Sequence, residues 1–396
     1  MYSNFTYKLL FIVAKATAGI GAFCGNFDPR ERIWYATEQS RKKFTLTTSA
    51  YISCIMFLWV KVVKFWVSEG GENHPDFYST YGFICLTSLN VWMILNFCIH
   101  QDDILISANR ILHYFPNFTK KWMRKSRASM KDILKYSQRM DKHVFLQVSI
   151  MLILPISPTT FVISSPDHPL APKQLLPQKF GINVHLLPSM ACIMMVAWAA
   201  MVSWYAMMLF VVFGTLYMIP ITVVMQEFDA SVITHHALSA LRTPPNLMRE
   251  YVNLQLVHKL VTQTTGPTLV VMHVVLFCNF TVLANWDTLD ISTLVILALY
   301  AISHQLMWAA TLQATGMLHF ASVKTLESWK AVVGRDKIET NVFQKFRKSM
   351  KPLSIGMEGV KTFNRLSAPK FKKDISVGTF RALLTLSKNR GDRKNM

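Results

Sequence analysis

The sequence predicts an all-α integral membrane protein with seven transmembrane helices and a cytoplasmic N-terminus. Three observations support this class. Of the 396 residues, 52% are hydrophobic and 16% are charged, whereas soluble domains carry roughly 25% charged residues. The charges are clustered, and positions 180–226 contain no Asp, Glu, Lys or Arg. A helix of that length is longer than the bilayer core of about 30 Å.

Residues 1–44 are expected to form a cytoplasmic segment that begins with an apolar helix. Only Lys8 precedes its apolar run and Lys15 interrupts it, which disfavours a cleaved signal peptide. We therefore expect a retained helix that lies at the membrane interface or re-enters the membrane.

Six apolar spans follow within residues 45–319. The fourth is the longest, and its middle, AWAAMVSWYAMM, favours one helix because it contains no turn residues. This fourth helix should continue below the membrane into a cytoplasmic helical anchor layer. The six spans cover about residues 45–67, 76–99, 143–163, 181–226, 266–286 and 291–319.

Charge placement predicts which side each loop faces. The loops at 100–142 and 227–265 are rich in basic residues, whereas those after the first and fifth spans carry acidic residues and no basic ones. Since Lys and Arg accumulate on the cytoplasmic side, the N-terminus is expected inside a multi-pass protein of the plasma membrane. In 227–265 we expect two amphipathic helices, separated at Pro244–Pro245.

The C-terminal quarter divides into three predicted parts. Residues 320–366 form a cytoplasmic anchor helix and loop, residues 367–388 a seventh helix, and residues 389–396 a tail that would be extracellular. The seventh helix contains Arg381 and is flanked by lysines, which suits lipid poorly. Its alternating leucines and small hydroxyl residues instead suit a helix that other helices shield from lipid and that lines a wet pore.

The sequence contains no catalytic signature, and we expect neither an enzyme nor a cofactor. It has no Gly-rich phosphate loop, no CxxC pair and no GxSxG elbow. The histidine pair His235–His236 is not enough for a metal site because the other histidines are scattered. The formal charge of +20 is explained by cytoplasmic loops that face anionic lipid, so no nucleic-acid partner is expected.

The outer halves of several spans carry aromatic and sulfur side chains with few polar ones. For any single residue, helix packing is the better explanation, but together they provide the adaptable apolar walls of a small-molecule site. An ionisable His304 inside a span is either a functional group or a hydrogen-bonded packing residue. The candidate ligand-binding residues are Tyr78, Tyr81, Phe83, Met190, Met194, Met195, Trp198, Tyr300, His304 and Met307.

The C-terminal quarter resembles the arthropod chemoreceptor superfamily, the odorant and gustatory receptors. Lys351-Pro352-Leu353 stand where that family has a basic-Pro-Leu stretch, and Thr362-Phe363 match its loop aromatic. Thr379-Phe380 match the pair in its last helix, and YVNLQLVHKLVTQ at 251–263 resembles its helix before the fifth span. Phe380 replaces a tyrosine of the gustatory signature and no Gln-Phe ending follows, so the resemblance leaves the subfamily open.

This resemblance implies a ligand-gated, non-selective cation channel, assembled as a homotetramer or as a heterotetramer with a co-receptor subunit. A small, mostly apolar, volatile or soluble odorant or tastant would bind between the outer halves of the second, third, fourth and sixth helices. Each subunit would contribute its seventh helix to a central pore, with two leucines as a dewetting gate. The candidate pore and gate residues are Ser376, Thr379, Phe380, Leu383, Leu384 and Ser387.

The alternative is a six-span membrane transporter or lipid-handling protein with a basic cytoplasmic C-terminal tail. Paired carboxylates and inverted repeats are missing from the spans, which weakens the transporter. The side of the membrane on which the C-terminus lies distinguishes the two.

Overall fold

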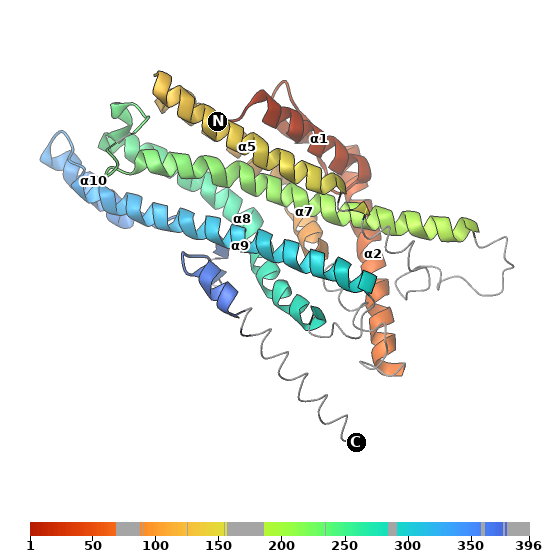
Figure 1. Ribbon diagram of the computed structural model, residues 1–396. Helices are drawn as coiled ribbons and strands as arrows, with labels where there is room; N and C mark the ends of the chain where they lie inside the picture. Colours follow the sequence, from red (N-terminus) through yellow and green to blue (C-terminus); the bar gives the residue numbers. More distant parts are fainter. Residues whose placement is uncertain are drawn as a thin grey trace.

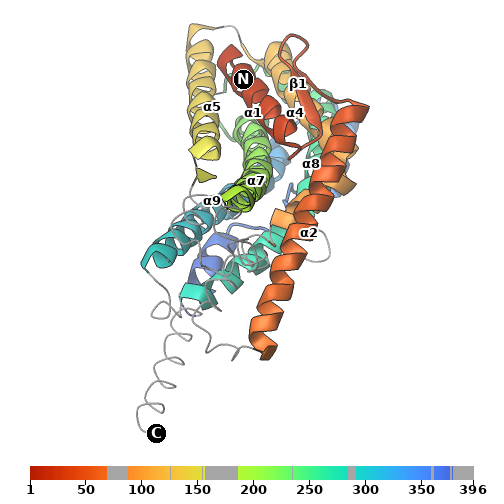
Figure 2. The ribbon, with the colours of Figure 1, turned by 90° about the vertical axis from the view of Figure 1, so that its right-hand side faces the viewer.

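The longest helix, α7 (Leu186–Phe228), runs as one unbroken helix of 43 residues. In this computed structural model it lies between α5 (Arg127–Ile153) and α9 (Ile291–Ser328), as Figure 1 shows. Figure 2 views α7 nearly along its axis, with α1, α5 and α9 around it. The helix is apolar on every side, which is the pattern of a helix surrounded by others. The prediction of one helix across this uncharged run is confirmed.

The structure describes most of the chain. The described residues are 1–68, 88, 90–124, 126–153, 155–156, 186–233, 235–283, 291–357, 361–374 and 377.

The N-terminal helix α1 (Asn4–Ile20) is packed into the bundle. Ser3 caps it by accepting a hydrogen bond from the Thr6 amide, and Gly21 ends it with a positive φ of 78°. Its buried side chains contact α5 and α7, and a hairpin of β1 (Gly25–Asp28) and β2 (Ile33–Ala36) follows. The predicted helix is confirmed, but its buried face belongs to the protein core rather than to a membrane surface.

Helix α2 (Glu38–Ser68) presents an apolar stripe to its surroundings. Met56, Val60, Val63 and Val67 are exposed, and their spacing places them on one face of the helix. A contiguous exposed apolar face of this kind is suited to lipid rather than to water.

Two helical stretches of the described chain are long and apolar enough to cross a membrane, namely Glu38–Lys64 and Ile193–Phe228. Helix Asn90–Ile99 is apolar but shorter. The predicted fifth span, 266–286, lies in α8 as far as Leu283, beyond which its last residues are outside the described part of the chain, and the predicted sixth span lies within α9.

The basic loop predicted at 100–142 is mostly helical. Helix α4 (Gln101–Trp122) has acidic residues in its first turn and Lys120 and Lys121 in its last, which suits the helix dipole. Its apolar face, including Phe115 and Phe118, is buried against the bundle. The chain then reverses into α5.

The segment between α7 and α8 departs from the prediction of an amphipathic helix before Pro244. Residues 229–233 and 235–238 are irregular, and a single 3₁₀ turn, η4 (Ser239–Arg242), follows. Helix α8 (Pro244–Leu283) begins at the first proline. The cause lies in two carboxylates that bind backbone amides. Glu227 accepts from the amides of His236 and Ala237, and Asp229 accepts from the Ser231 amide. These bonds compete with helix formation.

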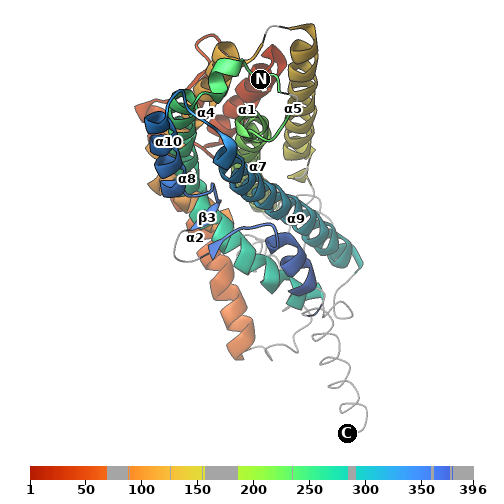
Figure 3. The ribbon, with the colours of Figure 1, turned by 90° about the vertical axis from the view of Figure 1, so that its left-hand side faces the viewer.

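Helix α8 continues through Gly266 and Pro267 for 40 residues, so the amphipathic stretch and the predicted fifth span form one helix. Figure 3 shows α10 (Lys337–Ser349) beside α8. Asp336 caps α10 by accepting from the Glu339 amide at 2.7 Å, and Glu339 accepts from the Arg335 amide. This capping explains why a helix begins here, within the range in which an anchor helix is predicted.

Candidate functional site

A cavity of about 370 Å³ lies where α4, α5, α7, α8 and α9 meet. Its walls are mostly apolar, with aromatic rings from three helices. A cavity of this size and composition is typical of sites for small organic molecules. The aromatic residues that line it are Phe97, Phe210, Phe213, Tyr217 and Trp308.

Two polar atoms at this cavity lack a hydrogen-bond partner within the described chain. They are Ser107 Oγ and Gln147 Oε1, both buried. The same Gln147 donates from Nε2 to Thr215 Oγ1 at 2.6 Å, which fixes the orientation of its amide. An unpaired buried acceptor is costly, and Gln147 Oε1 is such an acceptor on a side chain of the cavity wall.

The cavity is connected to the start of the predicted seventh helix through Trp308. This side chain is fully buried and meets the rings of Phe363 and Phe371 edge to face, with centroid separations of 5.7 and 6.5 Å. Phe371 lies in the helical stretch 367–374. Trp308 therefore lies against the first turns of that predicted helix, residues 367–374.

A second connection runs through the segment 351–357, which lies against α8 and α9. Ser322 Oγ accepts from the Leu353 amide at 2.7 Å, and Tyr251 donates to the Lys351 carbonyl at 3.3 Å. Two short strands, β3 (Gly356–Met357) and β4 (Lys361–Thr362), then form a hairpin.

His258 links three parts of the fold at this point. Its Nε2 lies 3.0 Å from the carbonyl oxygen of Ser354, and its Nδ1 lies 2.5 Å from the Tyr217 hydroxyl. Since a carbonyl only accepts, Nε2 carries the proton and Nδ1 accepts from Tyr217. Burial lowers the pKa of His258 to about 4, against the opposing effect of the Ser354 hydrogen bond. The imidazole is therefore neutral at physiological pH.

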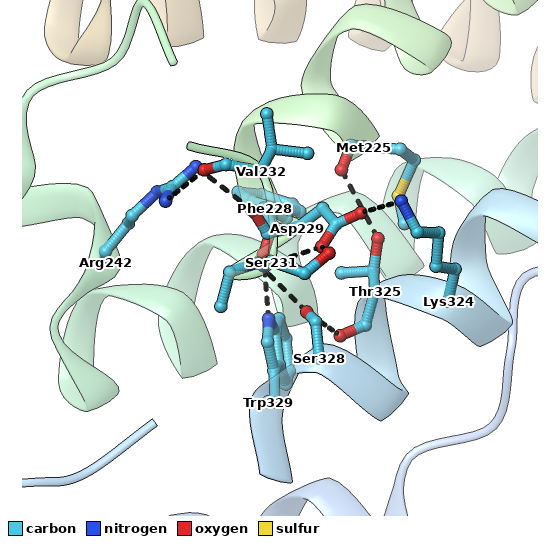
Figure 4. A network of polar contacts seen from close by, with 11 residues as sticks. Met225, Phe228, Asp229, Ser231, Val232, Arg242, Lys324, Thr325, Ser328 and Trp329 are labelled. Carbon is cyan, nitrogen blue, oxygen red and sulfur yellow. Dashed lines mark hydrogen bonds and ion pairs between the residues drawn. The ribbon is translucent and has the colours of Figure 1, made fainter. Parts of the chain in front are cut away.

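The inner ends of α7 and α9 are held together by the polar network in Figure 4. Lys324 forms an ion pair with the buried Asp229 at 3.0 Å, and Trp329 donates from Nε1 to the Phe228 carbonyl at 2.9 Å. Arg242 donates to the carbonyls of Val232 and Asp229. This network holds α7, η4 and α9 together at one end of the bundle.

The structure places only part of the predicted ligand site. Met190, Met194 and Met195 are exposed on the first turns of α7, and Trp198 packs against the core. Tyr300, His304 and Met307 belong to α9, but their side chains lie outside the described part of the structure. Also outside the described residues are Tyr78, Tyr81, Phe83, Ser376, Thr379, Phe380, Leu383, Leu384 and Ser387.

The cavity lies further along α7 and α9 than the predicted residues do. On α7 it is lined from Phe210 to Ile219, and on α9 from Trp308 to Thr315. These residues are absent from the predicted ligand site, because an aromatic residue or a Thr in an apolar helix gives the same sequence pattern whether it packs or lines a cavity. The spacing of Trp308, Thr311 and Thr315 on one helix face was the available signal.

Comparison with known proteins gives a match in structure but not in sequence. No family model matches the chain, and no curated protein is similar to it in sequence. The structure is similar to that of the insect olfactory receptor OR5 from Machilis hrabei, with a TM-score of 0.67 and 9% identity over 96% of this chain and 97% of that one. The same receptor in complex with eugenol gives a TM-score of 0.65 at 10% identity, over 96% and 98%. The all-helical fold of an insect olfactory receptor, expected from the C-terminal motifs, is therefore confirmed.

Proposed function

We propose that this chain is a member of the insect chemoreceptor superfamily and a subunit of a non-selective cation channel that a small, mostly apolar odorant opens. The observation that supports it most is the olfactory-receptor fold along nearly the whole chain, together with the motifs around Lys351 and Thr362. A fold alone does not establish an activity, so the cavity and its connections supply the functional argument.

The ligand is proposed to bind in the cavity beside Trp308. Its aromatic and aliphatic walls suit an apolar molecule, and Gln147 Oε1 suits one hydroxyl group. The similar receptor is described in complex with eugenol, a molecule of this chemical class. The predicted residues from Met190 to Trp198 and from Tyr300 to Met307 lie on the same two helices. Because Met190 is about 30 Å along α7 from Phe210, the residues near it would form a separate, outer candidate site.

Opening is proposed to depend on the contacts between this cavity and the seventh helix. A ligand favours the open state only if it binds that state more tightly than the closed one. Trp308 lines the cavity and contacts Phe371. A ligand that moves Trp308 would therefore also move Phe371 and, with it, the predicted seventh helix at 367–388. Leu383 and Leu384 would then be the gate and Ser376, Thr379, Phe380 and Ser387 would line or flank the pore.

The proposal is tested by expressing the chain alone and with an insect co-receptor subunit, and recording membrane currents under a panel of odorants and tastants. A ligand-evoked, cation-carried current in either setting is expected. Its absence in both, with surface expression confirmed, would contradict a channel function.

The predicted topology has its own test. An epitope tag after Met396 should be accessible from outside intact cells, and a tag before Met1 should not. A C-terminal tag that only permeabilised cells reveal would favour the six-span transporter or lipid-handling protein.

The ligand class is tested with Gln147→Leu. This variant should lose sensitivity to a phenolic odorant by about tenfold, the loss of about one hydrogen bond to a buried group. Its response to a hydrocarbon odorant of similar size should change little. Equal losses for both ligands would show that Gln147 does not contact the hydroxyl.

A further inference from the structure

A groove of about 660 Å³ lies between α4 and α8, separate from the odorant cavity. Polar side chains from both helices face it and are exposed, while Phe118 and Val257 form part of its floor. The polar residues that line it are Arg110, His113, Asn117, Lys121, Asn253, Lys259 and Gln263.

The groove has an excess of positive charge. Its one carboxylate, Glu250, is buried and already pairs with Lys121 at 2.7 Å and with Arg249 at 3.7 Å. Arg110 and Lys259 make no hydrogen bond or ion pair within the described part of the chain. With three basic residues and one carboxylate, the groove carries a net positive charge, which suits an anion with more than one negative charge.

The surroundings of the groove indicate where that anion comes from. Ile106, Arg110, Asn117 and Lys121 are spaced so that they share one face of α4. The exposed Ile106 stands nearest the predicted second span, and the basic residues follow further from it. On α8, Gln263 lies three residues before Gly266, where the predicted fifth span begins. The basic groove therefore lies on helices that adjoin two predicted spans, where the phosphorylated headgroup of a membrane lipid would stand.

We propose that this groove binds the headgroup of an inositol phospholipid of the cytoplasmic leaflet. Arg110, Lys121 and Lys259 would contact the phosphates, and the amides of Asn253 and Gln263 would donate to the inositol hydroxyls. Basic pockets at the cytoplasmic ends of membrane helices are suited to such headgroups. The proposal rests on the predicted membrane topology, but it does not require that the chain conducts ions.

The test measures binding of dioctanoyl phosphatidylinositol bisphosphate to the purified full-length chain in detergent. The variant Arg110→Gln/Lys259→Gln should bind at least about tenfold more weakly, since it loses two charge-assisted contacts. The variant Lys8→Gln/Lys15→Gln removes two exposed lysines of α1 and should bind as the natural chain does. The charge-conserving Arg110→Lys/Lys259→Arg should keep most of the affinity.

Four outcomes would overturn the proposal. Equal binding of dioctanoyl phosphatidylcholine would show that headgroup charge is not recognised. Equal affinity for free inositol trisphosphate would indicate a soluble phosphate ligand instead of a lipid. Unchanged affinity of Arg110→Gln/Lys259→Gln would place the lipid elsewhere. Loss of subunit assembly in that variant, without lipid binding by the natural chain, would make the groove a contact between subunits. Each readout is independent of odorant-evoked current.

Discussion

The imidazole Nε2 of His258 donates a hydrogen bond to the carbonyl oxygen of Ser354 at 3.0 Å. The two residues are 96 positions apart in the sequence, and the bond joins α8 to the segment that leads into the predicted seventh helix. Tyr217 of α7 donates to the other ring nitrogen. One neutral side chain thus connects the central helix to the segment before the proposed pore.

Replacing His258 by Phe should destabilise the protein by about 1–3 kcal/mol, because Tyr217 and the Ser354 carbonyl are left buried without their partner. His258→Gln, which keeps one amide donor, should cost less. Thermal unfolding in detergent measures both, and a Phe variant as stable as the natural chain would show that water replaces the imidazole.

His258 also predicts a pH dependence of stability. The pKa of this imidazole falls from an ordinary value of 6.5 to about 4 in the fold, so the unfolded chain takes up a proton first as the pH falls. This group should therefore lower stability between pH 6.5 and pH 4 by up to about 1.4 kcal/mol per pH unit, and contribute no pH dependence above 6.5. The stability difference between the natural chain and His258→Gln should shrink over that interval. A difference that does not vary with pH would contradict a neutral buried imidazole.

Gly316 is expected to be necessary for docking the segment before the seventh helix. A Cβ at this position would lie 2.7 Å from the carbonyl oxygen of Asn364 and 3.0 Å from Arg365 Cα. Gly316→Ala should therefore push this backbone away from α9 and cost about 1–3 kcal/mol, with altered basal current. Gly214→Ala in α7 is the control, because its Cβ would meet nothing within 4 Å. A melting temperature lowered equally in both variants would rule out a specific close approach.

Trp308 is expected to affect both stability and gating. Trp308→Ala removes a fully buried ring and should cost about 3–5 kcal/mol. Trp308→Phe keeps an aromatic edge toward Phe363 and Phe371 and should retain odorant-evoked current at reduced sensitivity. Dose–response curves for the two variants, corrected for surface expression, test this. If Trp308→Ala responded to the odorant at the same concentrations as the natural chain, Trp308 would not link the cavity to the seventh helix.

Asp229 and Lys324 should behave as a coupled pair. Although burial alone would raise the pKa of Asp229, hydrogen bonds from Ser231 and Lys324 keep it below its usual value. A double-mutant cycle with Asp229→Asn and Lys324→Gln should give a coupling energy of about 0.5–3 kcal/mol. Additive losses of stability would mean that the ion pair in Figure 4 contributes little.

Filling the cavity should reduce the odorant response without unfolding the chain. Ala314 lines the cavity and Ala309, on the same helix, does not. Ala314→Leu should lower ligand sensitivity, while Ala309→Leu should leave it nearly unchanged. If current recordings showed a larger loss of ligand sensitivity in Ala309→Leu than in Ala314→Leu, the odorant would bind outside this cavity.

Several elements could be predicted from the sequence because their signals are local. The unbroken α7 follows from an uncharged run without turn residues, and α10 follows from Asp336 and Glu339 at capping-box spacing. The all-helical class follows in the same way from apolar runs and helix-compatible periodicity. The resemblance at Lys351-Pro352-Leu353 also anticipated the olfactory-receptor fold.

Other features could not be predicted from the sequence, because they depend on contacts between segments that the hydrophobic periodicity does not reveal. The segment 229–238 has an amphipathic pattern, yet Glu227 and Asp229 bind its amides and prevent a helix. The sequence of the N-terminal helix did not reveal that one of its faces packs against α5 and α7, while Phe5, Phe11 and Ile12 remain exposed. The position of the cavity was likewise open, because helix packing and cavity lining use the same side chains.

The sequence by itself therefore determined that the chain is mainly helical, which stretches are apolar enough for a membrane and which segments carry the positive charge. Only the tertiary structure decided that Trp308 meets Phe371, that His258 meets Ser354 and that Gln147 lines a cavity. The physical reason is that hydrophobic patterning acts between neighbours along the chain. These pairings, in contrast, join residues far apart in sequence, whose geometry is set by how all the helices pack at once.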